Sequence, residues 1–348
     1  MTYKSSNSSL PATIKVLRLG NCLTAFLAFA SLLATHRNSF AQMPPIMAHK
    51  VILADEGNGK VHSINLANPS ERWSITTANR DMQIIGGDRL MVSVGDGYAE
   101  YDVKTGALAK KIPVGGVVQS AFRLASKSTF IGTDGNPASI LEVDSAGKQI
   151  RKISLAVNVS IRVVRSTPAR TFLVGGKAAG LMYECDSTGS IKWEAQVGGE
   201  PYMALRLPNG NTLISTGYGA QMVLVDSKAK VLKRYPTQAD ISGSDFWAQA
   251  RPHFFAGFQV LKNGNIVVSN WQDHGGGNGG KGFQLMEFDG GLTKVVSYWK
   301  QDAALVSSLH GVLVLDSLDT KIMHSDVNGA LSPVDVPVNL RKPYLGNP

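Results

Sequence analysis

The sequence has little cysteine, a small share of charged residues and a single long apolar run. Its 348 residues include two Cys, which excludes a disulfide-stabilised scaffold. Charged residues make up 18%, and outside the N-terminal segment no block of basic residues occurs, so we expect no nucleic-acid partner. No segment repeats its apolar residues with a period of 3.6 over a dozen positions, which excludes helical repeats. Apolar residues nevertheless make up 43%, enough for a buried core.

The one apolar run, Cys22–Ala34, follows a basic N-terminus that has no acidic residue. Ser39 and Ala41 place small residues at positions −3 and −1 of a cleavage site, which is typical of a secretory signal. A membrane-spanning helix needs about 20 apolar residues, and this run is shorter. We therefore predict a signal peptide over residues 1–41 cleaved after Ala41, with an uncleaved anchor as the alternative. The mature chain, 42–348, would be a single secreted or periplasmic domain without a membrane span.

The mature chain contains an internal repeat. Apolar or aromatic residues lead into Asp, a short turn reaches Gly, and a second apolar stretch follows, as in Tyr101-Asp102-Val-Lys-Thr-Gly106 before Leu108–Ile112. Asp can cap the amides of such a turn, and Gly tolerates its positive φ. The repeats are anchored at Asn65, Asp102, Asp144, Asp186, Asp226, Asp289 and Asp326. A period near 40 residues that contains only short strands indicates a β-propeller.

Seven anchors predict an all-β fold, a seven-bladed β-propeller of four-stranded antiparallel blades. The 307 mature residues then give about 44 residues per blade. The first repeat lacks an innermost strand, and residues 338–342 have no blade of their own. We expect these C-terminal residues to supply that strand, so that N- and C-terminal strands share one blade. A closed ring leaves no unpaired sheet edge between its first and last blades.

The repeats resemble those of secreted bacterial propellers of the quinoprotein-like and arylsulfotransferase-like superfamily. The resemblance rests on Leu207–Ile214 (LPNGNTLI), Leu261–Val267 (LKNGNIV) and Asp102–Gly106 (DVKTG), and it covers most of residues 50–335. It implies a PQQ-like repeat and a propeller fold. The quinone-dependent members are longer and carry a Trp after their Asp-x-x-Thr-Gly turn. Asp102–Gly106 lacks that Trp, so we expect no pyrroloquinoline quinone and predict no cofactor.

One candidate site lies on the propeller axis. Aligning the innermost strands places a polar residue between two apolar ones in five repeats: Gln83, Arg123, Arg162, Arg206 and Gln259. Arg341 would complete the series. A ring of guanidinium and amide donors could hold an anion or a polyol. The alternative is structural, in which each side chain binds carbonyl groups of the neighbouring blade.

A second candidate site lies where one repeat spacing lengthens to 63 residues. The extra residues form two segments, 236–255 and 271–281, which should emerge on the same face of the propeller and meet over the channel. They offer aromatic surfaces for a ligand in Trp247, Phe254 and Trp271. They also offer His253, His274, Arg251 and Asp273 for catalysis or ligand binding. The alternative is a lid whose aromatic residues form its own small core.

Metal binding has weaker support. Asp55, Glu56, Asp96, Asp134 and Asp316 could bind Ca²⁺ through oxygen atoms, but turns favour Asp in any case, so we commit to no metal site. We expect a binding or interaction protein whose partner is a small polar, carbohydrate or anionic ligand, or another protein. A hydrolase, lyase or transferase acting at the same face on a small polar or anionic substrate is the alternative.

Overall fold

The computed structural model describes residues 43–78, 80–156, 159, 161–175, 180–301 and 304–334. The chain divides into two units, residues 1–43 and 44–348, and the following description concerns the second. The predicted signal peptide over 1–41, residues 338–342 and Arg341 lie outside the described residues, and the signal peptide stays a prediction.

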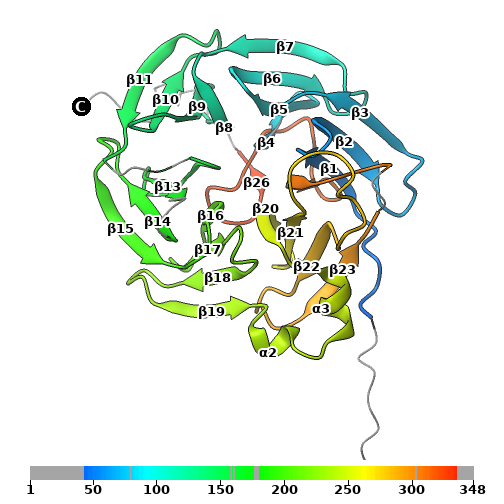
Figure 1. The fold of residues 1–348 in the computed structure, drawn as a ribbon. Helices are drawn as coiled ribbons and strands as arrows, with labels where there is room; N and C mark the ends of the chain where they lie inside the picture. Colours follow the sequence, from blue (N-terminus) through cyan, green and yellow to red (C-terminus); the bar gives the residue numbers. More distant parts are fainter. Residues whose placement is uncertain are drawn as a thin grey trace, which may run out of the picture. The chain divides into compact units, whose positions relative to one another are not determined.

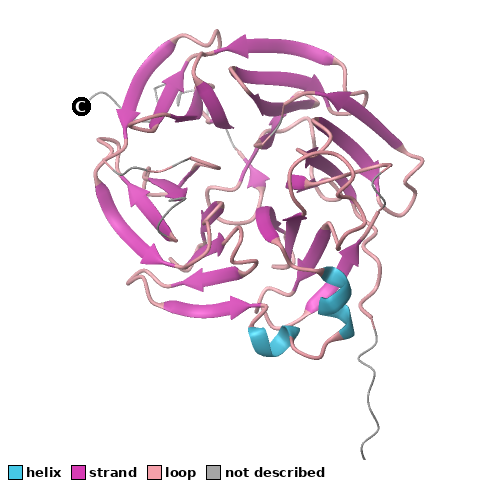
Figure 2. Cartoon of the chain, in the orientation of Figure 1, coloured by secondary structure: helices cyan, strands magenta, loops and turns pink. Residues whose placement is uncertain are grey.

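Six four-stranded antiparallel sheets surround a central axis in the described part of the chain (Figures 1 and 2). From the axis outwards, blade 1 consists of β24 (Leu309–Val314), β1 (Lys50–Asp55), β2 (Lys60–Asn65) and β3 (Arg72–Thr76). Blade 2 consists of β4 (Met82–Gly86), β5 (Arg89–Val94), β6 (Gly97–Asp102) and β7 (Leu108–Pro113). Blade 3 consists of β8 (Val117–Arg123), β9 (Thr129–Asp134), β10 (Ser139–Val143) and β11 (Gln149–Ser154). Blade 4 consists of β12 (Arg165–Ser166), β13 (Phe172–Gly175), β14 (Leu181–Cys185) and β15 (Ile191–Gln196). Blade 5 consists of β16 (Met203–Arg206), β17 (Thr212–Ser215), β18 (Met222–Val225) and β19 (Val231–Tyr235). Blade 6 consists of β20 (Phe254–Val260), β21 (Ile266–Trp271), β22 (Leu285–Phe288) and β23 (Val295–Trp299).

The prediction of seven blades is therefore wrong. The seventh anchor, Asp326, opens a turn between two strands of only two residues each, β25 (His324–Ser325) and β26 (Ser332–Pro333). The turn chemistry is present there, but too few apolar residues flank it to build a blade. A strand from late in the chain does complete blade 1, and it is β24 rather than residues 338–342.

The repeated Asp turns form as their chemistry predicts. The Asp102 carboxylate accepts hydrogen bonds from the amides of Lys104 (3.0 Å) and Thr105 (2.9 Å). The hydroxyl and the amide of Thr105 are the main cause of a pKa of Asp102 below its usual range. Gly106 follows at φ 72°, and a Cβ there would lie 2.8 Å from the Trp73 ring, so only glycine fits. Each such turn connects the two outermost strands of its blade.

Apolar side chains from neighbouring blades form the core between them. Met91 and Tyr98 of blade 2 pack with Ile131 and Leu141 of blade 3 in one buried cluster. A corresponding cluster joins blades 1 and 6 and includes residues from β1, β21, β22 and β24. The ring is thus closed by β24 within blade 1 and by this cluster between blades 1 and 6.

The β25–β26 hairpin lies at the centre of the ring, where Figure 1 shows β26 between the blades. The Gln83 side chain donates a hydrogen bond to the His324 carbonyl oxygen at 2.9 Å, and Met323 bridges to Ile85 beside β4. The segment before the hairpin meets the turn after β4, where the Thr320 hydroxyl donates to Asp88 at 2.5 Å. We call the propeller face that carries this turn the hairpin face.

Two short helices, α2 (Gln238–Ile241) and α3 (Asp245–Ala250), interrupt the connection between blades 5 and 6 (Figure 2). Phe246 packs on Phe283 and Tyr298, and Trp247 packs on Tyr235 and Phe288. These contacts hold α3 against blade 6 at the rim of the ring (Figure 1). The helical part of the first predicted insertion therefore covers blade 6 rather than the channel.

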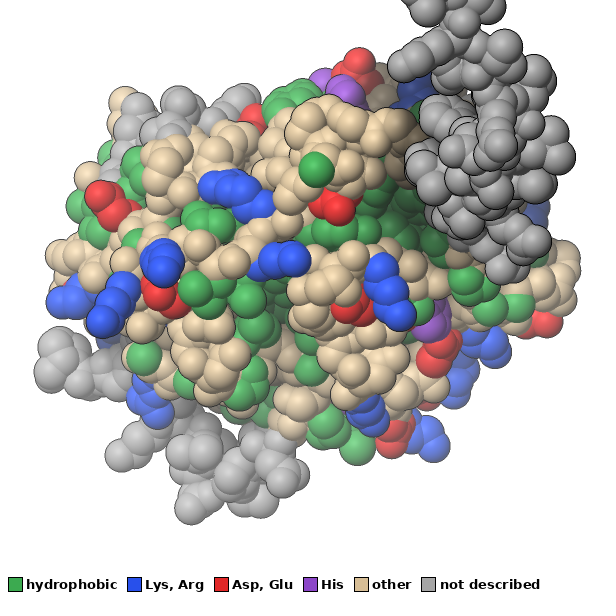
Figure 3. Space-filling model, turned by 90° about the horizontal axis from the view of Figure 1, so that it is seen from below, with side chains coloured by type: hydrophobic (Ala, Val, Ile, Leu, Met, Phe, Trp, Pro, Cys, Tyr) green, Lys and Arg blue, Asp and Glu red, His purple; other side chains and the backbone are tan. Residues whose placement is uncertain are grey.

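Charged side chains of both signs are interspersed on the face drawn in Figure 3. No helix in the described ranges has the length and the hydropathy that a bilayer crossing requires.

Candidate functional site

Opposite the hairpin face lies the mouth face. It carries the connections between blades and those between the second and third strands of each blade, because antiparallel strands alternate in direction. A cavity of about 170 Å³ opens on this face. It is lined by Arg80, Arg162, Glu200, Tyr202, Tyr218, Phe254, Trp271, His274 and His310. We call it the mouth cavity.

Aromatic rings form one wall of the mouth cavity. Tyr218 meets Phe254 edge-on at 4.8 Å between ring centroids, and Phe254 meets Trp271 at 5.3 Å. Trp271 also stacks on His310 at 5.9 Å. Tyr218 is 56% exposed, whereas Phe254 and Trp271 are buried. Tyr218 is thus the ring whose face is available for a ligand to stack on.

Charged groups and a hydroxyl form another part of the lining. Arg162 donates two hydrogen bonds to one carboxylate oxygen of Glu200, from Nε at 3.1 Å and from Nη2 at 2.7 Å. The guanidinium of Arg80 lies over the Tyr202 ring, 6.0 Å from its centroid. Burial raises the pKa of Tyr202, and the positive charges of Arg80 and Arg162 only partly offset that rise. The Tyr202 hydroxyl therefore stays protonated at neutral pH and can donate a hydrogen bond.

Glu56 positions two of the lining residues. Its carboxylate accepts a hydrogen bond from the Trp271 indole at 2.9 Å and lies 2.8 Å from His274 Nδ1. The His274 side chain is 72% exposed, and its ring meets Trp271 edge-on at 4.7 Å. A histidine oriented by a carboxylate is the arrangement that a general base requires.

The glycine-rich segment 273–280 is held in place by one buried side chain. Asn278 Nδ2 donates to the carbonyl oxygens of Asp273, His274 and Gly275, at 3.1, 2.9 and 2.9 Å. The Ser308 hydroxyl also donates to the Asp273 carbonyl oxygen, at 2.5 Å. Asp273 itself has φ 101°, a backbone conformation unusual for a residue with a Cβ. These bonds fix the backbone that carries His274.

The other predicted residues of the two insertions are not among those that line the mouth cavity. Trp247 is buried in the aromatic cluster under α3. Arg251 ends α3 in the left-handed conformation, and its carbonyl oxygen accepts hydrogen bonds from Asn270 and Gln272. His253 is exposed beside the cavity and stacks on Trp271 at 5.9 Å. The Asp273 carboxylate accepts a hydrogen bond from the His274 amide at 2.8 Å.

The predicted axial ring is not a single ring. Gln83 and Gln259 line the channel. Phe122 and Leu205, from the innermost strands of blades 3 and 5, line it as well. Arg123 and Arg206 come one residue later than Phe122 and Leu205, so their side chains point to the other side of the sheet. A one-residue offset at Arg123 and Arg206, and a three-residue offset at Arg162, produced the apparent ring in the sequence alignment.

Four of the five predicted side chains join neighbouring blades: Gln83, Arg123, Arg206 and Gln259. Gln83 exchanges hydrogen bonds with the Arg123 backbone, and Gln259 does so with Val314. Arg123 forms an ion pair with Glu100 at 2.7 Å, and Arg206 forms one with Glu184. Both glutamates lie on the third strand of the preceding blade. Only Arg162 of the five predicted residues lines the mouth cavity.

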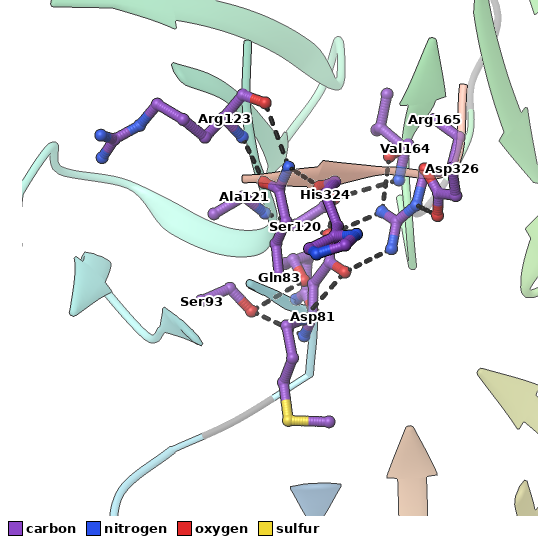
Figure 4. Close-up of polar contacts among 12 residues, drawn as sticks. Asp81, Gln83, Ser93, Ser120, Ala121, Arg123, Val164, Arg165, His324 and Asp326 are labelled. Carbon is purple, nitrogen blue, oxygen red and sulfur yellow. Dashed lines mark hydrogen bonds and ion pairs between the residues drawn. The ribbon is translucent and has the colours of Figure 1, made fainter. Parts of the chain in front are cut away.

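Sequence reasoning missed Arg165, the buried arginine that lies in the channel. Figure 4 shows it between Asp81 and Asp326, to which it donates hydrogen bonds of 2.7–2.9 Å. Burial opposes its charge, but the two carboxylates outweigh that effect and raise the pKa of Arg165. Aligning Pro168 with Pro208 would have placed Arg165 opposite Leu205, at a channel-facing position.

The acidic residues considered for Ca²⁺ do not converge. Within the described ranges, no group of three or more His, Cys, Asp or Glu side chains could hold a metal ion. Asp55 is buried and accepts hydrogen bonds from the amides of Ser307 (2.9 Å) and Ser308 (3.1 Å). Burial alone would raise the pKa of Asp55. Hydrogen bonds from His62 and from these amides nevertheless hold this pKa below its usual range.

No protein-family model matches the chain, and no curated protein matches it in sequence. Among solved structures, a protein of unknown function from Bacteroides caccae is 20% identical, with a TM-score of 0.63 over 76% of this chain and 98% of its own. A streptogramin B lyase is 12% identical, with a TM-score of 0.50 over 74% of this chain and 82% of its own. These similarities confirm the propeller fold. Membership of the quinoprotein-like superfamily stays a prediction.

Proposed function

We propose that this protein binds a small ligand with an anionic group and a flat apolar face at the mouth cavity. The observation that carries the proposal is the meeting of Arg80 and Arg162 with an aromatic wall in one cavity. Arginine favours anionic groups such as carboxylates, and an exposed tyrosine ring favours the flat face of a sugar or an aromatic ring. The signal peptide predicted from the sequence supports a role in the periplasm or outside the cell.

Titration with matched probe pairs tests this proposal. D-glucuronate and benzoate should raise the melting temperature in proportion to their affinity, and the neutral D-glucose and benzyl alcohol should raise it less. Losing one charged hydrogen bond costs about 1.5–3 kcal/mol. Arg80→Gln should therefore weaken binding roughly tenfold or more. Tyr218→Ala should also weaken binding, because it removes the exposed ring.

Leu232→Ala on β19 is the matched control, because this side chain is exposed and absent from the lining of the mouth cavity. It should leave probe binding unchanged. Equal binding of charged and neutral probes, or no binding of either, would refute the proposal.

An enzyme acting on the same ligand is the second candidate, and the pairing of His274 with Glu56 favours it. His274 would act as the general acid or base of a hydrolase, lyase or transferase, while the guanidinium groups would stabilise negative charge. Incubating esters and glycosides of the bound probes with the protein in water should then release the free probe and the alcohol of the cleaved bond. His274→Gln should lower that rate about 10²–10⁴-fold without an equal loss of affinity.

A further inference from the structure

A second depression adjoins the mouth cavity on the same face. It is a groove of about 380 Å³ over blades 1 to 3, with Val94, Val117, Val118 and Gln119 in its lining. Val117 is 56% exposed, so its side chain is open to a ligand. We call this depression the valine groove.

The valine groove and the mouth cavity share residues at their boundary. Arg80 lines both. Glu56 lines the valine groove, and its carboxylate binds Trp271 and His274, which line the mouth cavity. A ligand that reaches Arg80 from the aromatic wall is therefore already at the edge of the groove.

The volumes of the two depressions favour a ligand that occupies both the mouth cavity and the valine groove. Pockets for small ligands usually enclose about 300–1,000 Å³. The mouth cavity alone, at about 170 Å³, is smaller than this range, whereas the two depressions together fall within it. The complete site thus suits a ligand longer than one ring.

The chemistry of the boundary restricts the kind of long ligand. An acyl chain running from one part to the other would bury Arg80 and Glu56 against hydrocarbon, which is costly for charged groups. A peptide added as a β-strand needs a free sheet edge. Strand β5 is paired on both sides. The inner edge of β8 is occupied, because the Ala121 amide donates to the Asp81 side chain and the Arg123 amide donates to the Gln83 side chain. Sugar rings present apolar C–H faces to valines and hydroxyl groups to an amide such as that of Gln119.

We infer that the ligand is an acidic oligosaccharide of at least two sugar units. One unit stacks on Tyr218 in the mouth cavity, its carboxylate meets Arg80, and the next unit occupies the valine groove. This inference rests on the proposed function and specifies the ligand class of the same site.

Chain length of the probe tests the inference. Galacturonate, digalacturonate and trigalacturonate are titrated against the full-length protein by calorimetry. The dimer and trimer should bind at least tenfold more tightly than the monomer. Val117→Glu, which fills the groove from an exposed position and places a carboxylate there, should reduce the affinity for the dimer and trimer to that of the monomer. It should leave the affinity for the monomer unchanged.

Leu108→Glu, at an equally exposed apolar residue on the outermost strand of blade 2, is the matched control and should change nothing. Gln119→Ala is a second groove variant for use if Val117→Glu lowers the melting temperature. Monomer binding without any gain for the longer probes would overturn this inference and leave the proposed function intact. Binding of tetraglutamate as tight as that of trigalacturonate would also overturn it. No binding of any uronate would overturn both.

Discussion

Arg165 joins three parts of the chain that lie far apart in the sequence. It comes from blade 4, Asp81 precedes blade 2, and Asp326 belongs to the β25–β26 hairpin. All three side chains are at most 10% exposed. Burial raises the pKa of Asp326 against the opposing charge of Arg165. The arginine therefore binds two buried carboxylates at once, and its single positive charge offsets the charge of one of them.

Removing this arginine should destabilise the fold. Taking one partner from a buried ion pair leaves an uncompensated charge and costs about 3–5 kcal/mol. We expect Arg165→Met to lower the free energy of unfolding by that amount in urea denaturation. The triple variant Arg165→Met, Asp81→Asn, Asp326→Asn should recover part of the loss, because no buried charge remains. Lys230→Ala, an exposed control, should change the free energy by less than about 0.5 kcal/mol.

A loss of less than 1 kcal/mol in Arg165→Met would show that the cluster is open to water. Sequence alone could not have identified this cluster, since its carboxylates lie 84 and 161 residues from Arg165. Phe254, Trp271 and His274 were predictable as site residues because they interrupt a repeat. Arg80, Tyr202 and His310 were not, because each lies at the start of an ordinary repeat.

The segment 273–280 shows how a glycine-rich loop can be ordered by its surroundings. Its sequence predicts a flexible turn, but the Asn278 side chain donates to three of its carbonyl oxygens and the Asn278 amide donates to the Ser307 hydroxyl at 3.1 Å. The cost of ordering glycine is therefore offset by bonds within the loop and to the segment just before β24. This arrangement keeps His274 beside Trp271.

We expect Asn278→Ala to loosen this loop without unfolding the propeller. Unmade buried hydrogen bonds cost about 1–3 kcal/mol, and here the loss falls on a local segment. Amide hydrogen exchange over residues 273–280 should become faster, while exchange in β20 to β23 stays slow. Asn263→Ala, an exposed turn residue of the same blade, is the control. Unchanged exchange in the loop would show that Ser307 and Ser308 hold it alone.

Ring closure brings together residues from both ends of the propeller sequence. His49, just before β1, lies 2.5 Å from Asp316 and 3.5 Å from Glu287 of blade 6. The hydrogen bond that His49 donates to Glu287 is the main cause of a raised pKa of His49, with Asp316 adding to it against burial. Burial of Glu287 opposes its charge and would raise its pKa. The hydrogen bond with His49 is the main cause that lowers this pKa instead.

This closure should depend on pH. The raised pKa of His49 stabilises the fold fully below its ordinary value of 6.5, and this contribution is lost as pH rises through the folded pKa. The lowered pKa of Glu287 contributes to the stability of the fold above pH 4.5, and this contribution is lost as the pH falls through the folded pKa. The pair therefore contributes most between these values, by about 1 kcal/mol or less for a partly exposed pair.

Denaturation at pH 5.5 and pH 8.5 checks this prediction. His49→Gln should reduce the difference in unfolding free energy between the two pH values. His253→Gln, whose exposed ring contacts Tyr218 and Trp271, should preserve the difference. An identical difference in wild type and His49→Gln would contradict the prediction.

The propeller as a class was predictable from its repeats, but the blade number was not. Six of the seven Asp or Asn anchors belong to blades, and the seventh has the same turn chemistry in a hairpin. Turn residues report a local bend, whereas a blade requires four strands with apolar neighbours on both sides. Counting strands around Asp326, rather than turns, would have given six.

The hairpin at the centre of the ring also bears on how the proposed ligand would move. Within the described residues, β25 and β26 occupy the channel and Arg165 is bonded to Asp326 there, so the mouth cavity does not continue through the ring. Under the proposed function, a polymer would therefore not be threaded through the ring, and only its end or an exposed side branch would enter the cavity. A bound ligand would leave on the mouth face, the same face on which the next one arrives.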